Sequence, residues 1–324
     1  MVSRMVTAGV AEDARRAAAA AARSAGVEVA ELRDPAEFRA AAALFGLVWA
    51  TAPEASPGPA DLLRALSHAG NFVAGAWRAG VLVGCSVAFL GLEAEPEPGV
   101  GVGPLGRLSL HSHVTGVVPD RRGAGVGFAL KQQQRAWALA REVTEVGWTF
   151  DPLVRRNAFF NLVKLGAVVI GYEPRFYGEM TDGINAGDES DRCVLRWRLL
   201  DDRVAAASQG VAAEPDPAEV EVAVIVLREG ERGEPIIDDH ALAGVLAEGL
   251  ALRCWVPADV VALRGSDPAR ALAWRRGLRA TMGETTRAGW RATGMTRSGW
   301  YLLTREGSTG PHGHNRGHDH GGRA

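Results

Sequence analysis

The chain has 324 residues, of which 47% are hydrophobic and 23% are charged, as in ordinary globular proteins long enough for two domains. Its formal net charge of −2 gives no electrostatic reason to expect a nucleic-acid partner. Three widely spaced cysteines make neither a disulfide framework nor a zinc pattern. We therefore expect no metal site in the folded part and a reducing, cytoplasmic location.

Residues 1–26 form an alanine- and arginine-rich segment. Charged residues interrupt it at Glu12, Asp13, Arg15 and Arg16, so it does not read as a signal peptide. No apolar run in the sequence approaches the length of a membrane span, and we expect no membrane partner.

The next stretch predicts a strand followed by two helices. Residues 27–32 read as a short strand. Asp34 and Pro35 then suit the N-cap and first position of a helix, whose apolar residues recur at helical spacing as far as Trp49. The SPGPA segment at 56–60 ends this helix, and a shorter leucine-containing helix follows it.

A β-hairpin is predicted after these helices. Two apolar runs, 71–78 and 81–90, lie on either side of Ala79 and Gly80, which suit a tight turn. Residues 91–106 are rich in proline and glycine and read as a loop.

The most informative stretch begins with a strand at 107–118. Its alternation predicts two different faces, Leu108, Leu110, Ser112 and Val114 against Ser109, His111, His113 and Thr115. Pro119 ends the strand, and three glycines at 123, 125 and 127 precede a helix that begins near Phe128. The first N–H groups of a helix have no partner inside it, so this helix start favours an anion.

The spacing of these glycines excludes two familiar phosphate loops. No Lys-Ser or Lys-Thr pair follows them, as a Walker A loop requires, and Phe128 stands where a dinucleotide-binding fingerprint needs its third glycine. The remaining pattern is R-x-x-G-x-G from Arg122 to Gly127, preceded by V-x-P at Val117 to Pro119. An ordinary glycine-bearing turn between a strand and a helix is the alternative interpretation.

The downstream elements favour a phosphate loop. A short strand at 148–152 ends in Asp-Pro, and a helix at 157–165 ends at Gly166 before another strand. The R-x-x-G-x-G loop, the Lys164-Leu165-Gly166 triplet and this order of elements resemble the GCN5-related N-acetyltransferase (GNAT) superfamily over residues 27–200. The resemblance implies an α/β (α+β) fold with a mixed, mostly antiparallel central sheet flanked by helices.

The rest of the chain predicts an added C-terminal region. Residues 201–218 read as a linker, and residues 219–306 as a smaller α+β region. Its expected elements are a strand at 220–227, a helix within 236–249, a helix at 267–288 and closing strands within 289–305. The stretches HSHVTGVVPDRRGAGVG and WTFDPLVRRNAFFNLVKLGA further resemble a bacterial group of predicted acetyltransferases with such an addition.

A His/Gly-rich tail, residues 307–324, is expected to be disordered and holds four of the eight histidines. Its H-x-H spacing could bind a transition metal weakly, although a glycine-diluted tail is more often an adventitious binder.

The resemblance implies a CoA-dependent N-acyltransferase with acetyl-CoA, succinyl-CoA or another acyl-CoA as cosubstrate. The backbone of Thr115 and Val117 would pair with the pantetheine arm, and the Val117 N–H would bind the thioester oxygen. The implied cofactor-binding residues are Thr115, Val117, Arg122, Gly123, Ala124, Gly125, Val126, Gly127, Phe128, Asn157 and Asn161.

Two histidines are the candidates for removing the proton of the acceptor amine. His111 and His113 lie in the strand before the loop, and an unperturbed imidazole titrates near neutrality, at about 6.5. We place His113 first because it is nearer the loop. The alternative is a pair that merely packs the sheet.

The proton donor for the departing thiolate is harder to assign. Many superfamily members carry a tyrosine two residues before the lysine of the Lys-Leu-Gly triplet, and Leu162 occupies that position here. Tyr177, or else Tyr172, could take over, or the thiolate could leave unassisted.

The acceptor site is predicted between the last two strands of the GNAT-like unit. Glu179 or Asp182 could bind an amino group and Arg192 a carboxylate, which favours a small amine or amino acid. A solvated turn is the alternative for each residue. A non-catalytic acyl-CoA sensor is the alternative function, supported by Leu162, and exposed strand edges make a homodimer possible.

Overall fold

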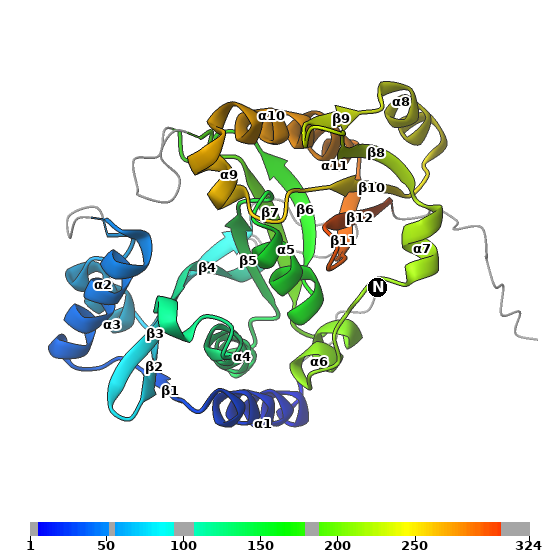
Figure 1. Ribbon diagram of the computed structural model, residues 1–324. Helices are drawn as coiled ribbons and strands as arrows, with labels where there is room; N and C mark the ends of the chain where they lie inside the picture. The colour runs from blue at the N-terminus through cyan, green and yellow to red at the C-terminus, as the bar shows by residue number, and fades with distance from the viewer. Residues whose placement is uncertain (1–5, 52–55, 94–106, 179–187, 306–324) are drawn as a thin grey trace, which may run out of the picture.

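The computed structural model describes residues 6–51, 56–93, 107–178 and 188–305. Within these ranges, twelve strands form one sheet in the order β1-β2-β3-β4-β5-β7-β6-β11-β12-β10-β8-β9 (Figure 1). The strands are β1 (Glu28–Glu31), β2 (Phe72–Arg78), β3 (Val81–Glu93), β4 (Arg107–Val117), β5 (Glu145–Phe150), β6 (Val168–Glu173), β7 (Arg192–Arg198), β8 (Val224–Glu229), β9 (Pro235–Ile237), β10 (Leu252–Trp255), β11 (Trp290–Met295) and β12 (Trp300–Arg305).

Neighbouring strands are antiparallel except for β4 with β5 and β8 with β10, so the predicted mixed, mostly antiparallel sheet is confirmed. The helices are α1 (Ala8–Ala25), α2 (Pro35–Trp49), α3 (Ala60–His68), α4 (Val126–Leu139), α5 (Arg155–Phe159), α6 (Asp202–Ser208), α7 (Pro217–Val222), α8 (Asp239–Glu248), α9 (Val260–Ser266), α10 (Pro268–Leu278) and α11 (Glu284–Arg287). Single π-helical turns, Phe160–Lys164 and Arg279–Gly283, continue α5 and α10.

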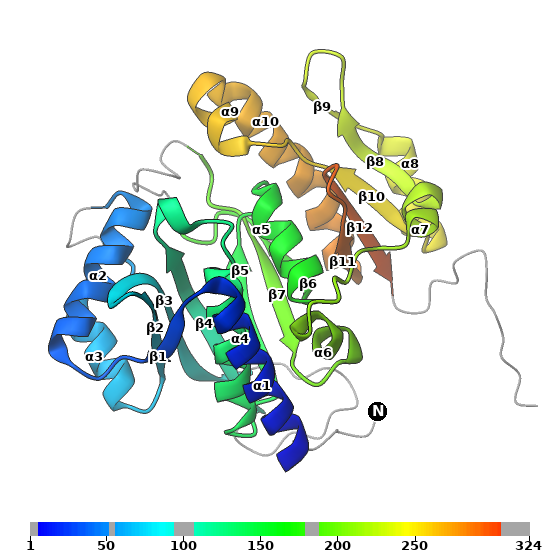
Figure 2. The same ribbon diagram turned by 60° about the horizontal axis from the view of Figure 1, so that its bottom comes forward.

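Helices cover both faces of the first half of the sheet. Helix α1 lies beside α4 on one face, where their alanines pack with Phe72 and Leu110 (Figure 2). Helices α2 and α3 cover the other face, where Phe38 and Phe45 pack against Val87 and other strand residues. Strands β2 to β5 therefore have one face toward α4 and one toward α2, and these two faces are named the α4 face and the α2 face below.

Local signals of the sequence account for the first elements. Glu37 accepts a hydrogen bond from the backbone N–H of Asp34 at 3.0 Å, and Pro35 opens α2, as a capping box requires. Ala79 and Gly80 both have positive φ, 48° and 75°, which suits the right-handed twist of a two-residue hairpin turn between β2 and β3. The predicted helix and hairpin are confirmed.

The two faces predicted for β4 change sides within the strand. Val87 of β3 pairs with Val114 and Ala88 pairs with Ser112, so His113 is an extra residue in a β-bulge. Ser112 contacts Lys131 of α4, whereas Val114 packs with the α2 cluster. The prediction that Ser112 and Val114 share a face is therefore wrong, because alternation does not reveal a bulge.

The strand predicted at 220–227 begins later than expected. Residues Pro217–Val222 form α7, and β8 starts at Val224. Asp216 accepts from the Ala218 N–H at 2.8 Å and Pro217 occupies the first helical position, so these helix-start signals outweigh the β-branched alternation that follows. The predicted linker 201–218 contains α6 and the start of α7.

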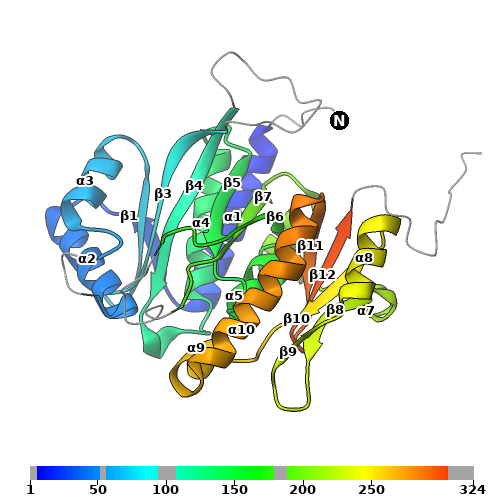
Figure 3. The same cartoon turned by 90° about the horizontal axis from the view of Figure 1, so that it is seen from above.

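The C-terminal strands continue the sheet of the first unit. Val169 of β6 pairs with Ala292 of β11, and Figure 3 shows the strands from β1 to β9 as one row. Both parts of the chain thus contribute strands to one sheet. The division into a domain at 27–200 and a C-terminal region at 219–306 stays a prediction.

Buried ion pairs fasten α9 and α10 to the first unit. The Arg275 side chain is 0% exposed and donates to Asp151 at 2.9 Å and to Asp188 at 2.8 Å. Arg264 donates to the same two carboxylates, and Arg279 donates to Asp191 at 2.7 Å. Asp151 follows β5, and the other two carboxylates precede β7. We call Asp151, Asp188, Arg264 and Arg275 the ionic joint.

Candidate functional site

The glycine-rich loop ends at an uncapped helix. A short 3₁₀ turn at Pro119–Arg121 follows β4, and Gly125 then stands at the N-cap of α4. Gly123 and Gly125 have φ of 83° and 84°, a region that favours glycine. No side chain caps α4 and its first turn holds no acidic residue, so its leading N–H groups are available to an anion.

The edge of β4 next to this loop is open. Strand β4 pairs with β5 only at Leu110 with Val146 and His111 with Gly147, so the strands part after His111. Between Ser112 and Val117, no other described strand pairs with that edge of β4. An open edge can hydrogen-bond an extended chain that carries amide groups.

Thr115 and Val117 are placed to use that edge. The N–H of Val118 donates to Val83 in β3 at 3.0 Å. Because backbone groups of successive strand residues point to alternate sides, those of Val117 and Thr115 point to the open edge. A Cβ added to Gly127 would lie 3.9 Å from Val117, so the helix start and the open edge are neighbours.

Asn157 and Asn161 lie on the helix after β5. Asn157 is exposed in α5, and Asn161 is buried in the π-helical turn that follows it. Leu162 stands two residues before Lys164, the position discussed above for a proton-donating tyrosine. Its side chain is 0% exposed and lies in the apolar core. Among the described residues, no hydrogen bond joins either asparagine to residues 122–128.

His111 and His113 are close together on the α2 side of β4. Their ring centroids are 6.4 Å apart, and Phe89 lies 5.0 Å from the first ring and 6.0 Å from the second. His113 is exposed, with Nε2 3.2 Å from the carbonyl oxygen of Pro57. Burial lowers the pKa of His111, and the neighbouring charges of His113 and Lys131 lower it further.

Tyr177 lies beside Thr149 of β5, and its ring lies against the side chain of Arg192. The phenol oxygen is 3.4 Å from Thr149 Oγ1, and the ring lies 5.2 Å from the Arg192 guanidinium carbon. Arg192 is buried and donates to the carbonyl of Asp191 at 2.8 Å. Glu179 and Asp182, the other predicted acceptor residues, lie outside the described residues.

Comparisons with known proteins give only distant similarities. No family model and no curated protein matches the chain. An acetyltransferase of the GNAT family from Streptococcus pneumoniae is 14% identical, with a TM-score of 0.39, over 52% of this chain and 97% of that one. The structure of yncA from Salmonella typhimurium with its cofactor acetyl-CoA is 16% identical, with a TM-score of 0.41, over 55% and 95% of the two chains.

A third solved structure is GphF, a GNAT-like decarboxylase in complex with isobutyryl-CoA. It is 19% identical, with a TM-score of 0.38, over 53% of this chain and 99% of that one. The chain is similar to GNAT proteins. The descriptions of two of these structures name GNAT, the superfamily that residues 122–127 and 164–166 resemble in sequence.

Lys131 is a candidate site residue that the sequence patterns did not predict. It lies in α4, is 4% exposed, and its Nζ donates to Ser112 at 2.7 Å and to Gln134 at 3.2 Å. The Nζ also lies 3.8 Å from the centroid of the Trp148 ring. Burial lowers the pKa of the ammonium to about 7. Ser112 and Trp148 are the first residues after the last β4–β5 pair, so Lys131 lies where the strands part.

The sequence carried one signal for this lysine. It is a charged residue directly after Ala129 and Leu130 within a helix. The position in the sequence does not tell a solvated lysine from a buried one, because the lysine side chain becomes buried only when α4 packs against β4 and β5.

Two further features of the described residues bear on the sequence predictions. Within the described ranges, no three His, Cys, Asp or Glu side chains gather so as to hold a metal ion, and the histidine tail lies outside those ranges. Among the described helices, none is long and apolar enough to cross a membrane. Cys85, Cys193 and Cys254 are buried free thiols.

Proposed function

We propose that this protein is a CoA-dependent N-acyltransferase that moves an acetyl, succinyl or other acyl group to the amine of a small molecule or amino acid. The observation that carries the proposal is the uncapped start of α4 beside the open edge of β4. The first suits a pyrophosphate and the second an extended arm with amides, and acyl-CoA contains both groups in sequence.

The residues present fit acyl-CoA. The backbone N–H groups from Gly125 to Phe128 would hold the pyrophosphate, with Arg122 beside them. The backbone of Thr115 and Val117 would hold the arm, and the Val117 N–H would face the carbonyl oxygen. Bound acyl-CoA supplies an activated acyl group, whose carbonyl an amine can attack.

Transfer forms a C–N bond and breaks a C–S bond, so one proton leaves nitrogen and one reaches sulfur. His113 is the first candidate to accept the amine proton, because its ring is exposed and lies at the bulge beside the open edge. His111 is the second, because its lowered pKa keeps it neutral near pH 7 and able to accept a proton.

Lys131 is our candidate for the proton that reaches sulfur. Its ammonium has a pKa of about 7, so Nζ can release a proton near neutrality, as an effective general acid should. Its place where β4 and β5 part faces the same gap that the arm would enter. Lys131 thus offers a route for the proton to sulfur that needs no tyrosine at position 162. We rank it above Tyr177, because the phenol of Tyr177 lies on the opposite face of the sheet.

The experiment compares binding of acetyl-CoA, succinyl-CoA and CoA by calorimetry to the full chain and to Gly127→Glu. The added carboxylate would occupy and repel the anion position at the start of α4. Gly244→Glu in α8 is the matched control, because a Cβ there meets nothing within 4 Å. Release of free thiol is then followed with a panel of amines and amino acids.

The proposal of an enzyme is supported if acyl-CoA binds the unmodified chain and Gly244→Glu but not Gly127→Glu, and if an amine causes release of free thiol. Binding without thiol release by any amine favours the sensor instead. Absence of CoA binding by the folded, unmodified chain overturns both.

A further inference from the structure

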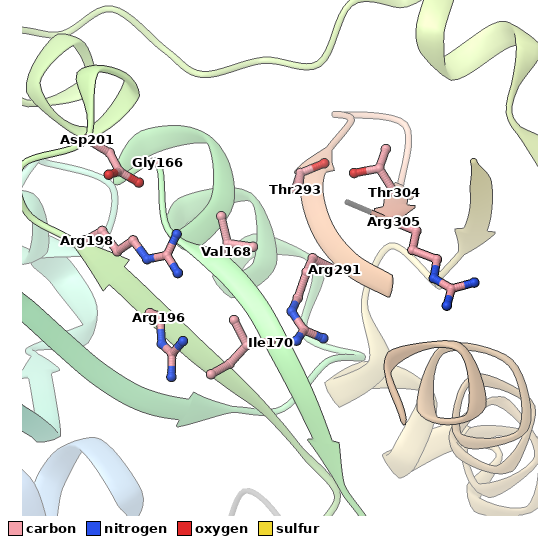
Figure 4. A pocket seen from close by; sticks show the side chains of 10 residues that line it. All are labelled: Gly166, Val168, Ile170, Arg196, Arg198, Asp201, Arg291, Thr293, Thr304 and Arg305. Atoms are coloured by element: carbon pink, nitrogen blue, oxygen red, sulfur yellow. The ribbon is translucent and has the colours of Figure 1, made fainter. Parts of the chain in front are cut away.

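A basic pocket opens on the sheet where the first unit and the C-terminal strands meet. Its volume is about 180 Å³, and it lies over β7, β6, β11 and β12. Figure 4 shows Arg196 and Arg198 of β7 on one side, Val168 and Ile170 of β6 between, and Arg291 of β11 opposite. We call this the arginine pocket.

The lining of the arginine pocket contains more arginines than carboxylates. Four arginines line it, including Arg305 at its outer side, against one carboxylate, that of Asp201. Arg196 also pairs with Glu145, at 2.8 Å. Arg291 donates through Nη1 to the Trp290 carbonyl at 3.2 Å, which uses one of the five N–H donors of a guanidinium. By residue type, the lining is therefore basic.

Two threonines add neutral donors and acceptors to the same lining. Thr293 follows Arg291 by two residues in β11, and Thr304 is the register partner of Arg291 in β12. Guanidinium forks with hydroxyl groups match the oxygens of phosphate and carboxylate, while Val168 and Ile170 offer an apolar floor. The lining thus has the chemistry of a site for a small organic oxyanion.

The strand register connects this pocket to the histidines. His111 pairs with Gly147, Gly147 with Arg196, and Arg196 with Val168. Adjacent strands lie about 4.8 Å apart, so His111 and Arg196 are about 10 Å apart along this row. A Cβ added to Gly147 would meet only the backbone oxygen of Leu195 within 4 Å, so no side chain covers the row at that point.

We propose that the arginine pocket binds a phosphate or carboxylate group of the acceptor, whose amine reaches the histidines along this row. The inference rests on the proposed function for the identity of its occupant. Arg291 and Arg305 come from the C-terminal strands, so those strands complete the acceptor site. The enzyme therefore selects amines that carry an anionic group about 10 Å or more from the nitrogen.

The first test measures anion binding directly. Inorganic phosphate, pyrophosphate and succinate are titrated by calorimetry, at constant ionic strength, into the full chain carrying Gly127→Glu, so that the start of α4 does not take the probe. Arg291→Gln and Arg198→Gln are added singly. Arg228→Gln, an exposed arginine of β8 outside the pocket, is the control.

We expect each pocket variant to weaken binding of the preferred probe about tenfold or more and the control to leave it unchanged, since charge-assisted hydrogen bonds carry the contact. Preference between phosphate and succinate tells which oxyanion the acceptor carries. Equal affinities in the pocket variants and the control, or no binding of any probe, overturn the proposal.

The second test uses turnover with paired acceptors, an amine whose phosphate or carboxylate group lies about 10 Å from its nitrogen and the neutral ester of the same compound. Arg291→Gln should raise the KM of the anionic acceptor about tenfold and leave its kcat, acetyl-CoA binding and the neutral acceptor unchanged. A kcat loss with both acceptors would contradict a binding role. If CoA itself does not bind, the proposed function fails, while the anion titration still decides whether the pocket is a site.

Discussion

The start of α4 and the ionic joint handle charge in opposite ways. At the joint, Arg275 is completely buried and its guanidinium meets Asp151 and Asp188 at 2.8–2.9 Å. At the start of α4, the donors are backbone N–H groups on an exposed loop, with no capping side chain and no acid. One region satisfies its charge internally, whereas the other leaves its donors for a ligand.

The difference separates a structural from a functional use of electrostatics. Burial alone would lower the pKa of Arg275, but the two aspartates raise it above its ordinary range. Burial would likewise raise the pKa of Asp151, and Arg275 and Arg264 lower it below its usual value. Removing one partner from the ionic joint leaves buried charge incompletely paired and lowers stability, whereas changing the loop should weaken ligand binding and leave the fold intact.

The largest expected effect is on ligand binding at the loop. Gly127→Glu should weaken acetyl-CoA binding about 100-fold or more, because a carboxylate at the helix start repels the anion that the N–H groups attract. The free energy of unfolding should match that of Gly244→Glu. Equal calorimetric affinities in the two variants would show that the start of α4 is not an anion site.

A substitution in the ionic joint should lower the stability of the fold rather than ligand binding. Arg275→Met is expected to lower the free energy of unfolding by about 3 kcal/mol, because Asp151 and Asp188 lose one of their two buried guanidinium partners and keep only Arg264. Arg276→Met is the control, since that side chain is 63% exposed and meets Glu189 at 3.5 Å. Urea unfolding of both variants measures the difference.

The same joint predicts a pH dependence. The pKa of Asp151 is lower in the folded than in the unfolded chain, so its contribution is complete above the unfolded value of about 4 and is lost as pH falls below it. The gap between the unmodified chain and Arg275→Met should therefore narrow in acid. A gap that stays constant down to the acid transition would show that Asp151 is not linked to Arg275.

Substitution of the two histidines should lower kcat/KM. His113→Ala should reduce it about 100-fold and His111→Ala less, as for loss of a general base. Acetyl-CoA affinity should stay unchanged, because the histidines lie on the face away from α4. A pH–rate profile checks the role: the acid limb should disappear in the variant that lacks the base, and its persistence in both variants would exclude the pair.

Lys131→Met should lower kcat about tenfold while increasing stability at neutral pH. The pKa of Lys131 falls from 10.5 to about 7 on folding, so the unfolded chain binds more protons between these values. The stability of the unmodified chain therefore rises with pH in this window, and its deficit relative to Lys131→Met should shrink. Unfolding curves at several pH values test this, and a constant difference would mean that the lysine does not titrate there.

The smallest effect is expected at Tyr177. Its phenol is 50% exposed, and its distance of 3.4 Å from Thr149 indicates a weak hydrogen bond. Tyr177→Phe should change kcat by about fivefold or less. A much larger loss in thiol release, with CoA binding intact, would move the proton-donor role from Lys131 to Tyr177.

Much of the fold was predictable from local signals. Asp34 and Pro35 start α2, Ala79 and Gly80 turn the hairpin, and Gly166, with φ of 72°, ends the turn after α5. Each of these features depends on a few adjacent residues, so a single sequence reveals it. The strand predicted at 220–227 was partly wrong because Asp216 and Pro217 start a helix there.

By itself, the sequence determined the glycine-rich loop and the helix after it, since R-x-x-G-x-G and that helix form one continuous segment. Only the tertiary structure decided three things: the bulge at His113, the burial of Lys131 between β4 and β5, and the gathering of Arg196 and Arg291 in one pocket. The reason is physical. Each depends on strands that are far apart in the chain and pair in the sheet, and hydrophobic periodicity specifies faces but not neighbours.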